Sequence, residues 1–147
     1  MTTAPLSQTA EDYLKEIYKL QAEQGRATTS ALAERVGVSP PSATAMLKKL
    51  AALKLLRHER YRGVILTPAG EKAAIEVIRH HRLLEQYLSE TLGIPVDEVH
   101  AEADRLEHAL SEELEARIDE SLGFPTHDPH GVPIPGADLT WPAEQAE

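Results

Sequence analysis

The sequence predicts a mainly α protein, in which an N-terminal winged helix-turn-helix with a small two-stranded wing precedes an all-α domain. Three observations lead to this fold class: two short helical patterns separated by a turn at Gly37, a basic hairpin pattern over 55–66, and a long helical periodicity after Thr67. The expected divisions are a winged-helix domain at 1–73, a helical domain at 74–136 and a C-terminal tail at 137–147.

The first three elements are expected to be helices. The first should begin with Thr9 as its N-cap and end at Gly25, and the second should run over about 29–36. Ser39 is a good N-cap for the third, and Pro40 suits its first turn. A helix, a short turn with glycine and a second helix together predict a helix-turn-helix.

The remaining elements follow a change of period. Residues 55–66 read LLRHERYRGVIL, in which two short apolar runs flank a basic tip, so we expect a hairpin. Thr67 and Pro68 then open a helix that should reach about Leu92, followed by helices over about 96–110 and 111–122. Residues 125–147 hold five of the ten prolines and should be mostly extended or loop.

Composition excludes several classes of protein. The 147 residues include no cysteine, which rules out disulfides and thiolate metal sites. No run of about 18 apolar residues could span a membrane, and the N-terminal sequence lacks the basic and apolar regions of a secretory signal, so we expect a cytoplasmic protein.

Charge is distributed unevenly along the chain. Residues 1–66 carry 10 basic and 6 acidic side chains, whereas residues 67–147 carry 5 basic and 18 acidic ones. This asymmetry predicts two tasks. The basic half could bind phosphates, and the acidic half is either a solvated surface or a place that holds cations.

Histidines and carboxylates gather in the acidic half. At helical spacing, one face of the predicted helix 96–110 carries His100, Asp104, Glu107 and His108, and the preceding helix carries His81 and Glu85 four residues apart. Such groups repel or compete for protons unless a cation lies between them, although ordinary ion pairs are the alternative. Imidazole and carboxylate without thiolate suit Mn²⁺, Fe²⁺, Co²⁺ or Zn²⁺.

These segments resemble a known family. The winged-helix pattern, His-Arg-Leu-Leu-Glu at 81–85, Val-His-Ala-Glu-Ala-Asp-Arg-Leu-Glu-His at 99–108 and Pro-Ile-Pro-Gly at 133–136 are together similar to the diphtheria toxin repressor and manganese transport regulator family (DtxR/MntR). The resemblance covers about residues 5–136. It implies a homodimeric, metal-activated repressor that binds a palindromic DNA operator and silences metal-uptake genes. Long members add an SH3-like domain after the Pro-Ile-Pro-Gly stretch, so we expect either a protein without that domain or a shortened form.

The resemblance also implies which residues are ligands. It places Asp12, Asp104, Glu107 and His108 in a primary metal site and His81, Glu85 and His100 in a second one, with Asp128 and His130 as further loop ligands. Iron-type members carry Met and Cys at the positions of Asp12 and Asp104, so the resemblance favours Mn²⁺ over Fe²⁺. A second carboxylate found in some members is Lys15 here, which argues against their two-ion cluster.

The winged helix contributes the candidate DNA-binding residues. Short side chains that can approach base edges are Ser39, Pro41, Ser42 and Thr44, and side chains expected at phosphates are Lys48, Lys49, Arg57, Arg60 and Arg62. The alternative for Pro40 and Pro41 is that they only shape the start of the helix.

Two other functions compete with this interpretation. One is a winged-helix regulator that senses a small organic ligand. The other is a metallohydrolase, which is disfavoured because the sequence has neither HExxH nor a glycine-rich phosphate loop. We therefore expect a regulator that is not an enzyme.

Overall fold

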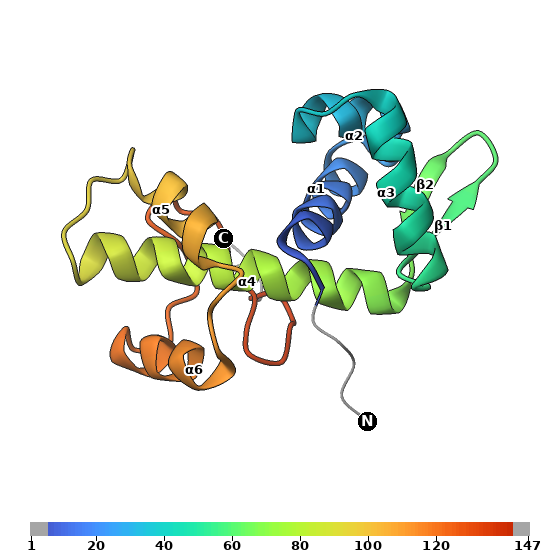
Figure 1. Ribbon diagram of the computed structural model, residues 1–147. Coiled ribbons are helices and arrows are strands. Elements are labelled where there is room, and N and C mark those ends of the chain that lie inside the picture. Colours follow the sequence, from blue (N-terminus) through green and yellow to red (C-terminus); the bar gives the residue numbers. More distant parts are fainter. Residues whose placement is uncertain (1–5, 143–147) are drawn as a thin grey trace. The chain divides into compact units, whose positions relative to one another are not determined.

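The computed structural model describes residues 6–142, and its chain divides into two compact units at Ile75 and Glu76 (Figure 1). The first unit contains three helices and a two-stranded hairpin. Its elements are α1 (Gln8–Gln24), α2 (Thr29–Val36), α3 (Pro40–Ala52), β1 (Leu56–Glu59), β2 (Gly63–Leu66) and the start of α4 (Pro68–Glu90). The second unit holds the rest of α4 with α5 (Val99–Leu106) and α6 (Glu112–Ser121). The predicted fold class is confirmed.

Side-chain caps set the starts of several helices. Ser39 and Ser111 accept hydrogen bonds from the backbone N–H of Ser42 and Leu114, at 3.3 and 3.1 Å. The predicted cap Thr9 is wrong, because Ser7 accepts from Ala10 N at 3.1 Å and α1 begins at Gln8. Serine and threonine cap equally well, and the apolar spacing of this segment does not distinguish them.

The helix predicted over 96–110 is shorter than expected. It covers only Val99–Leu106, because a turn at Pro95 precedes it, and beyond it Ala109 N bonds to Leu106 O three residues back. Glu107, the C-cap, and His108 therefore lie beyond the helix, and the expectation that one helical face carries both of them with His100 and Asp104 is wrong. The other predicted helices end within two residues of their expected bounds.

Apolar side chains from every element of the first unit form its core. Leu14, Ile17, Leu32, Leu47 and Leu50 are among the fully buried members. Burying such a side chain stabilises a fold by about 1.5–3 kcal/mol. Because α3 contributes several of these side chains, the core holds α3 in place beside the hairpin (Figure 1). In the second unit a smaller cluster joins α4, α5 and α6 through Leu83, Leu84, Ala103 and Ile118.

The hairpin is attached to the first unit by its backbone. β1 pairs antiparallel with β2, from Leu56 opposite Leu66 to Glu59 opposite Gly63. Val64 N donates to Ala27 O at 2.9 Å, next to Gly63, whose φ is +83°. A Cβ atom at Gly63 would lie 2.3 Å from Ala27 O, so only glycine allows this close approach. Within residues 6–142, none of the helices has the length and hydrophobicity of a membrane-spanning segment.

The substitution Gly63→Ala should lower the free energy of unfolding by about 2 kcal/mol or more, because it adds a clash with Ala27 O to the cost of a positive φ. Gly37→Ala is the matched control. It has a similar φ of +79° but open space around its Cβ position, so its cost should be about 1 kcal/mol. Urea unfolding of both variants measures the difference, and equal losses would contradict the argument.

Candidate metal centre and nucleic-acid interface

The predicted DNA-binding side chains share one property in the structure, which is exposure to solvent. They lie on α3 and on the hairpin of the first unit, and they are Ser39, Pro41, Ser42, Thr44, Lys48, Lys49, Arg57, Arg60 and Arg62. The apolar positions Ala43, Leu47 and Leu50 on the opposite side of α3 are buried in the core. One face of α3 and the hairpin are therefore available to a partner.

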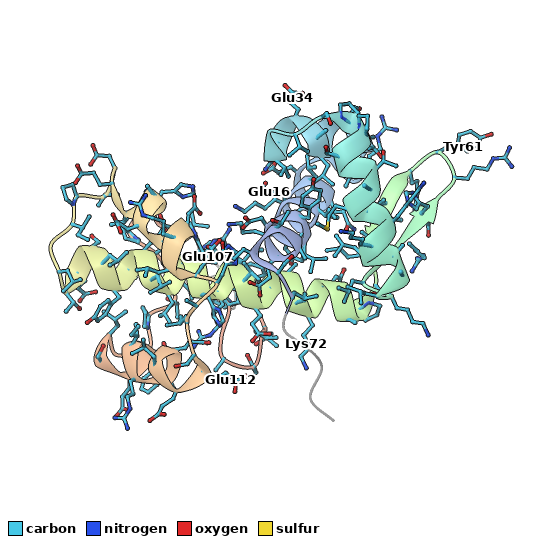
Figure 2. All side chains as sticks on the ribbon, in the orientation of Figure 1. Glu16, Glu34, Tyr61, Lys72, Glu107 and Glu112 are labelled. Atoms are coloured by element: carbon cyan, nitrogen blue, oxygen red, sulfur yellow. The ribbon has the colours of Figure 1, made fainter. Side chains whose placement is uncertain are left out.

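The hairpin arginines differ in their contacts. Arg57 donates two hydrogen bonds to Glu59, at 2.9 and 3.2 Å, and Arg62 lies 3.8 Å from the same carboxylate. Arg60 instead lies over the ring of Tyr61, 5.2 Å from its centroid. Figure 2 shows Tyr61 projecting beyond the turn of the hairpin.

Buried His81 is at the centre of a cluster in the second unit. Its Nδ1 lies 2.6 Å from a carboxylate oxygen of Glu107 and 3.3 Å from one of Asp104, and its Nε2 lies 3.1 Å from Oε1 of Glu85. His100 completes one set of three possible metal ligands, because its Nδ1 is 3.1 Å from His81 Nε2 and its Nε2 is 3.3 Å from Asp104. Two imidazoles and three carboxylates thus meet within one small volume.

A second set of possible ligands lies on the other side of Glu85. Here His130 Nδ1 is 3.6 Å from Glu85 Oε2 and 3.8 Å from Asp128 Oδ2. The other oxygen of Asp128 accepts backbone N–H groups of His130 and Val132, at 2.8 and 2.9 Å, which fixes this loop. The loop is also tied to α4, because Arg82 donates to Pro133 O at 2.8 Å.

One buried oxygen in this cluster lacks a hydrogen-bond donor. Glu85 is 3% exposed, and its Oε2 atom accepts no hydrogen bond. Burying a carboxylate oxygen without a partner is costly, whereas a cation would supply the missing interaction. The ligand atoms of each set lie within 4.8 Å of one another, so the residues present fit a divalent cation.

Protonation balances the charge of the cluster. Burial would lower the pKa of His81, but the carboxylates of Glu107 and Glu85 outweigh burial and raise it to about 9. Burial would raise the pKa of Glu85, but the neighbouring His81 outweighs this and lowers it. A proton on His81 therefore offsets part of the negative charge that a cation would otherwise neutralise.

The remaining predicted ligands lie in two different units. His108 is in the second unit, where its Nε2 is 3.2 Å from Oε1 of Glu107 and both side chains are buried. Asp12 is in α1 of the first unit, and one of its oxygens lies 4.0 Å from Lys15 Nζ. Within the second unit, Asp104 and Glu107 both lie at His81 Nδ1, and His108 contacts Glu107, so the assignment of ligands to particular ions stays a prediction.

Two residues beside the cluster were not predicted to matter. The Nδ1 atom of His80 lies 3.3 Å from the backbone oxygen of Glu107, and its Nε2 atom lies 2.6 Å from the Glu115 carboxylate. His80 thus contacts the backbone of Glu107, which is a candidate ligand. Arg79 is buried and pairs with Glu115 and Asp119 on α6. The four-residue spacing of these two carboxylates, which puts them on one helical face, is the signal that could have revealed the contact.

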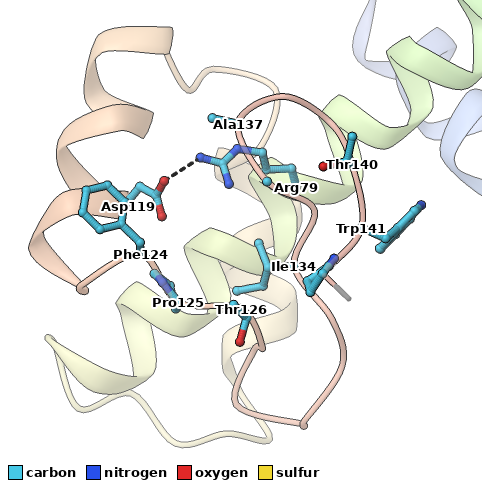
Figure 3. Close-up of a pocket in the computed structure, with 11 residues that line it drawn as sticks. Arg79, Asp119, Phe124, Pro125, Thr126, Ile134, Ala137, Thr140 and Trp141 are labelled. Atoms are coloured by element: carbon cyan, nitrogen blue, oxygen red, sulfur yellow. Dashed lines mark hydrogen bonds and ion pairs between the residues drawn. The ribbon is translucent and has the colours of Figure 1, made fainter. Parts of the chain in front are cut away.

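A cavity of about 350 Å³ lies beside Arg79 (Figure 3). Its walls include Phe124, Ile134 and Trp141, and Arg79 crosses it to Asp119, with 3.0 Å between Nη2 and Oδ2. A regulator that senses a small organic ligand would need such a cavity. Both charged side chains that line it are already paired with each other, so the cavity does not favour that alternative.

Known protein families match most of the chain. A family model described as the iron dependent repressor N-terminal DNA binding domain matches residues 5–64, and one described as the iron dependent repressor metal binding and dimerisation domain matches residues 67–136. The iron-dependent repressor IdeR of Mycobacterium tuberculosis is 41% identical over 131 residues, which are 89% of this chain and 57% of the relative. The diphtheria toxin repressor of Corynebacterium diphtheriae is 35% identical over 133 residues, 90% of this chain and 59% of the relative.

Solved structures of metal-dependent repressors are also similar to this chain. A manganese-dependent transcriptional repressor in complex with manganese has a TM-score of 0.85 and 50% identity, covering 92% of this chain and 62% of that one. IdeR of T. acidophilum has a TM-score of 0.78 and 32% identity, covering 98% and 65%. The chain spans a little over half the length of the curated relatives that it matches.

Glu85→Gln should weaken Mn²⁺ binding by at least about tenfold, or about 1.4 kcal/mol, because it removes a buried negative charge between the two sets of ligands. Glu90→Gln is the matched control, since it makes the same change at an exposed position of α4. Titration calorimetry compares the two. Equal Mn²⁺ affinities in both variants would rule out Glu85 as a ligand.

Cation binding should release protons at pH 7.5. Because the pKa of His81 is raised to about 9, its imidazole is mainly protonated there and must lose that proton to bind a cation. Mn²⁺ affinity should therefore rise by up to about tenfold per pH unit between pH 7 and pH 9. Calorimetry in buffers of different ionisation enthalpy counts the protons. A count of zero in the parent would contradict the assignment, and His58→Ala, outside the cluster, should leave the count unchanged.

Proposed function

This chain belongs to the iron-dependent repressor family, and from that premise we propose that it is a metal-activated transcriptional repressor that responds to manganese. As a homodimer it binds a palindromic operator in double-stranded DNA and silences metal-uptake genes. The observation that carries this proposal is the buried cluster around His81 and Glu85, in a chain whose first unit is a winged helix with an exposed basic hairpin.

The donor set supports manganese as the activating ion. The candidate ligands are oxygen-rich and contain no sulfur, and oxygen donors suit Mn²⁺. The resemblance to the DtxR/MntR family implies that Asp12 and Asp104 stand where iron-type members have Met and Cys. Fe²⁺, Co²⁺ and Zn²⁺ remain alternatives, because imidazole and carboxylate also bind them, and curated relatives include iron-dependent repressors.

A bound divalent cation would supply positive charge that several carboxylates share. In the second unit, the residues that would hold it are His81, Glu85, His100, Asp104, Glu107, His108, Asp128 and His130. Asp12 contributes from the first unit, as the resemblance implies. Ligands drawn from both units would restrict the freedom of the winged helix, which lowers the entropy cost of binding DNA.

The winged helix supplies the contacts to DNA. In each copy, α3 enters a major groove with Ser39, Pro41, Ser42 and Thr44, while its lysines contact phosphates. A dimer requires its two α3 helices to be about 34 Å apart, the length of one turn of DNA. Restricting each winged helix therefore favours the spacing that a palindrome demands.

DNA binding under different metals tests the proposal. Duplexes selected from a randomised library by the Mn²⁺-loaded protein should be bound at least roughly tenfold more tightly with Mn²⁺ than with chelator, a difference of about 1.4 kcal/mol. Parallel titrations with Fe²⁺ and Zn²⁺ identify the preferred ion. Equal binding after complete removal of metal would refute a metal-activated repressor.

Asp12→Ala should remove most of the Mn²⁺ dependence of DNA binding while leaving the fold intact, since Asp12 lies at the edge of the core. Glu34→Ala is the matched control, because it removes the same charge from an exposed position of α2 (Figure 2). Fluorescence anisotropy with the selected duplex compares them. If Asp12→Ala responds to Mn²⁺ as the control does, Asp12 is not a ligand.

A further inference from the structure

The hairpin of β1 and β2 carries an exposed aromatic ring, that of Tyr61, at its tip. Arg62 N donates to Glu59 O at 3.1 Å and closes the turn, in which Tyr61 has a φ of +68°. Tyr61 is 84% exposed. An aromatic residue that is held at positive φ and faces solvent contributes nothing to the core. Packing within this unit therefore does not account for an aromatic side chain at position 61.

The stem that carries this ring is fixed to the first unit at two points. Val64 N donates to Ala27 O at 2.9 Å, and Leu66 N donates to Oε1 of Gln21 at 3.1 Å. The tip is therefore presented at a defined place relative to α3 of the same unit. Because the hairpin is already ordered, a contact at its tip would cost less conformational entropy on binding.

Charge at the tip is concentrated on Arg60. Glu59 pairs with both Arg57 and Arg62, so one carboxylate offsets two of the three hairpin arginines. Among residues 6–142, no carboxylate pairs with Arg60, and its guanidinium lies over the Tyr61 ring instead. Stacking on the ring limits the side-chain conformations of Arg60 without neutralising its charge.

We propose that Arg60 and Tyr61 form a minor-groove reader, which selects A·T base pairs beside the half-site that α3 contacts. The inference rests on the proposed DNA-binding function. The minor groove of A·T tracts is narrow and carries an enhanced negative potential, which attracts an unpaired arginine. A G·C pair adds the N2 amino group of guanine to the floor of this groove, where a guanidinium would meet another donor.

The paired arginines play a different part. Because Arg57 and Arg62 share Glu59, part of their charge is already offset, and we expect them to contact backbone phosphates. Arg57 should therefore add affinity that is the same for every flanking sequence. Only the tip distinguishes one flank from another.

Inosine separates minor-groove reading from major-groove reading. An I·C pair lacks the N2 amino group, so its minor groove resembles that of A·T, while its major groove is that of G·C. The probe is the duplex selected by the Mn²⁺-loaded protein, with the base pairs beside each half-site made A·T, I·C or G·C. The parent should bind the A·T and I·C duplexes equally, within about twofold, and the G·C duplex roughly tenfold more weakly.

Variants assign this preference to the tip. Arg60→Ala should bind all three duplexes equally, and Tyr61→Ala should lose most of the preference. Tyr61→Phe keeps the ring and should keep the preference. The control Arg57→Ala should bind all three more weakly by the same factor. Because all these side chains are largely exposed, circular dichroism should show an unchanged fold.

The outcomes separate this inference from the function beneath it. Mn²⁺-dependent binding that is equal for the three parent duplexes, or a full preference in Arg60→Ala or Tyr61→Ala, overturns the minor-groove reader and leaves the repressor intact. Weak binding to both I·C and G·C also overturns it, because the reading would then be in the major groove. Failure of the Mn²⁺-loaded protein to select any duplex overturns both proposals.

Discussion

The imidazole of His81 is buried between the carboxylates of Glu85 and Glu107, and this contact sets the charge balance of the candidate metal centre. So many acidic groups can be packed together only if positive charge lies among them, either a proton on His81 or a divalent cation. The loop that carries Asp128 and His130 is held against the same glutamate, Glu85. A proton and a divalent cation would therefore compete for this place.

Much of the fold could be predicted from local patterns. Three-and-four apolar spacing located the helices, glycines marked two of the turns, and alternation with a basic tip located the hairpin, because each pattern depends on neighbours in sequence. The errors occurred where two residues are equally good caps or where no apolar pattern marks the end of a helix. Ser7 instead of Thr9 caps α1, and α5 stops at Leu106 because the chain turns back at Ala109.

The candidate site was predictable in composition but not in arrangement. Residue type and helical spacing identified His81, Glu85, His100 and Asp104, which the structure brings together. No local pattern could show that His130 reaches Glu85, since that contact joins segments 45 positions apart and depends on the path of the loop. The contacts of Arg79 and His80 with α6 were also missed, although the four-residue spacing of Glu115 and Asp119 could have revealed those of Arg79.

The proposed metal centre requires histidine nitrogens and carboxylate oxygens to bind the same ion. Pulsed electron paramagnetic resonance of the Mn²⁺-loaded protein, prepared with ¹⁵N-labelled histidine, detects nitrogen bound to the ion directly. We expect a histidine coupling in the parent and its loss or reduction in His81→Gln. A spectrum of Mn²⁺ surrounded only by oxygen, identical in both proteins, would contradict the claim that this cluster is a metal centre.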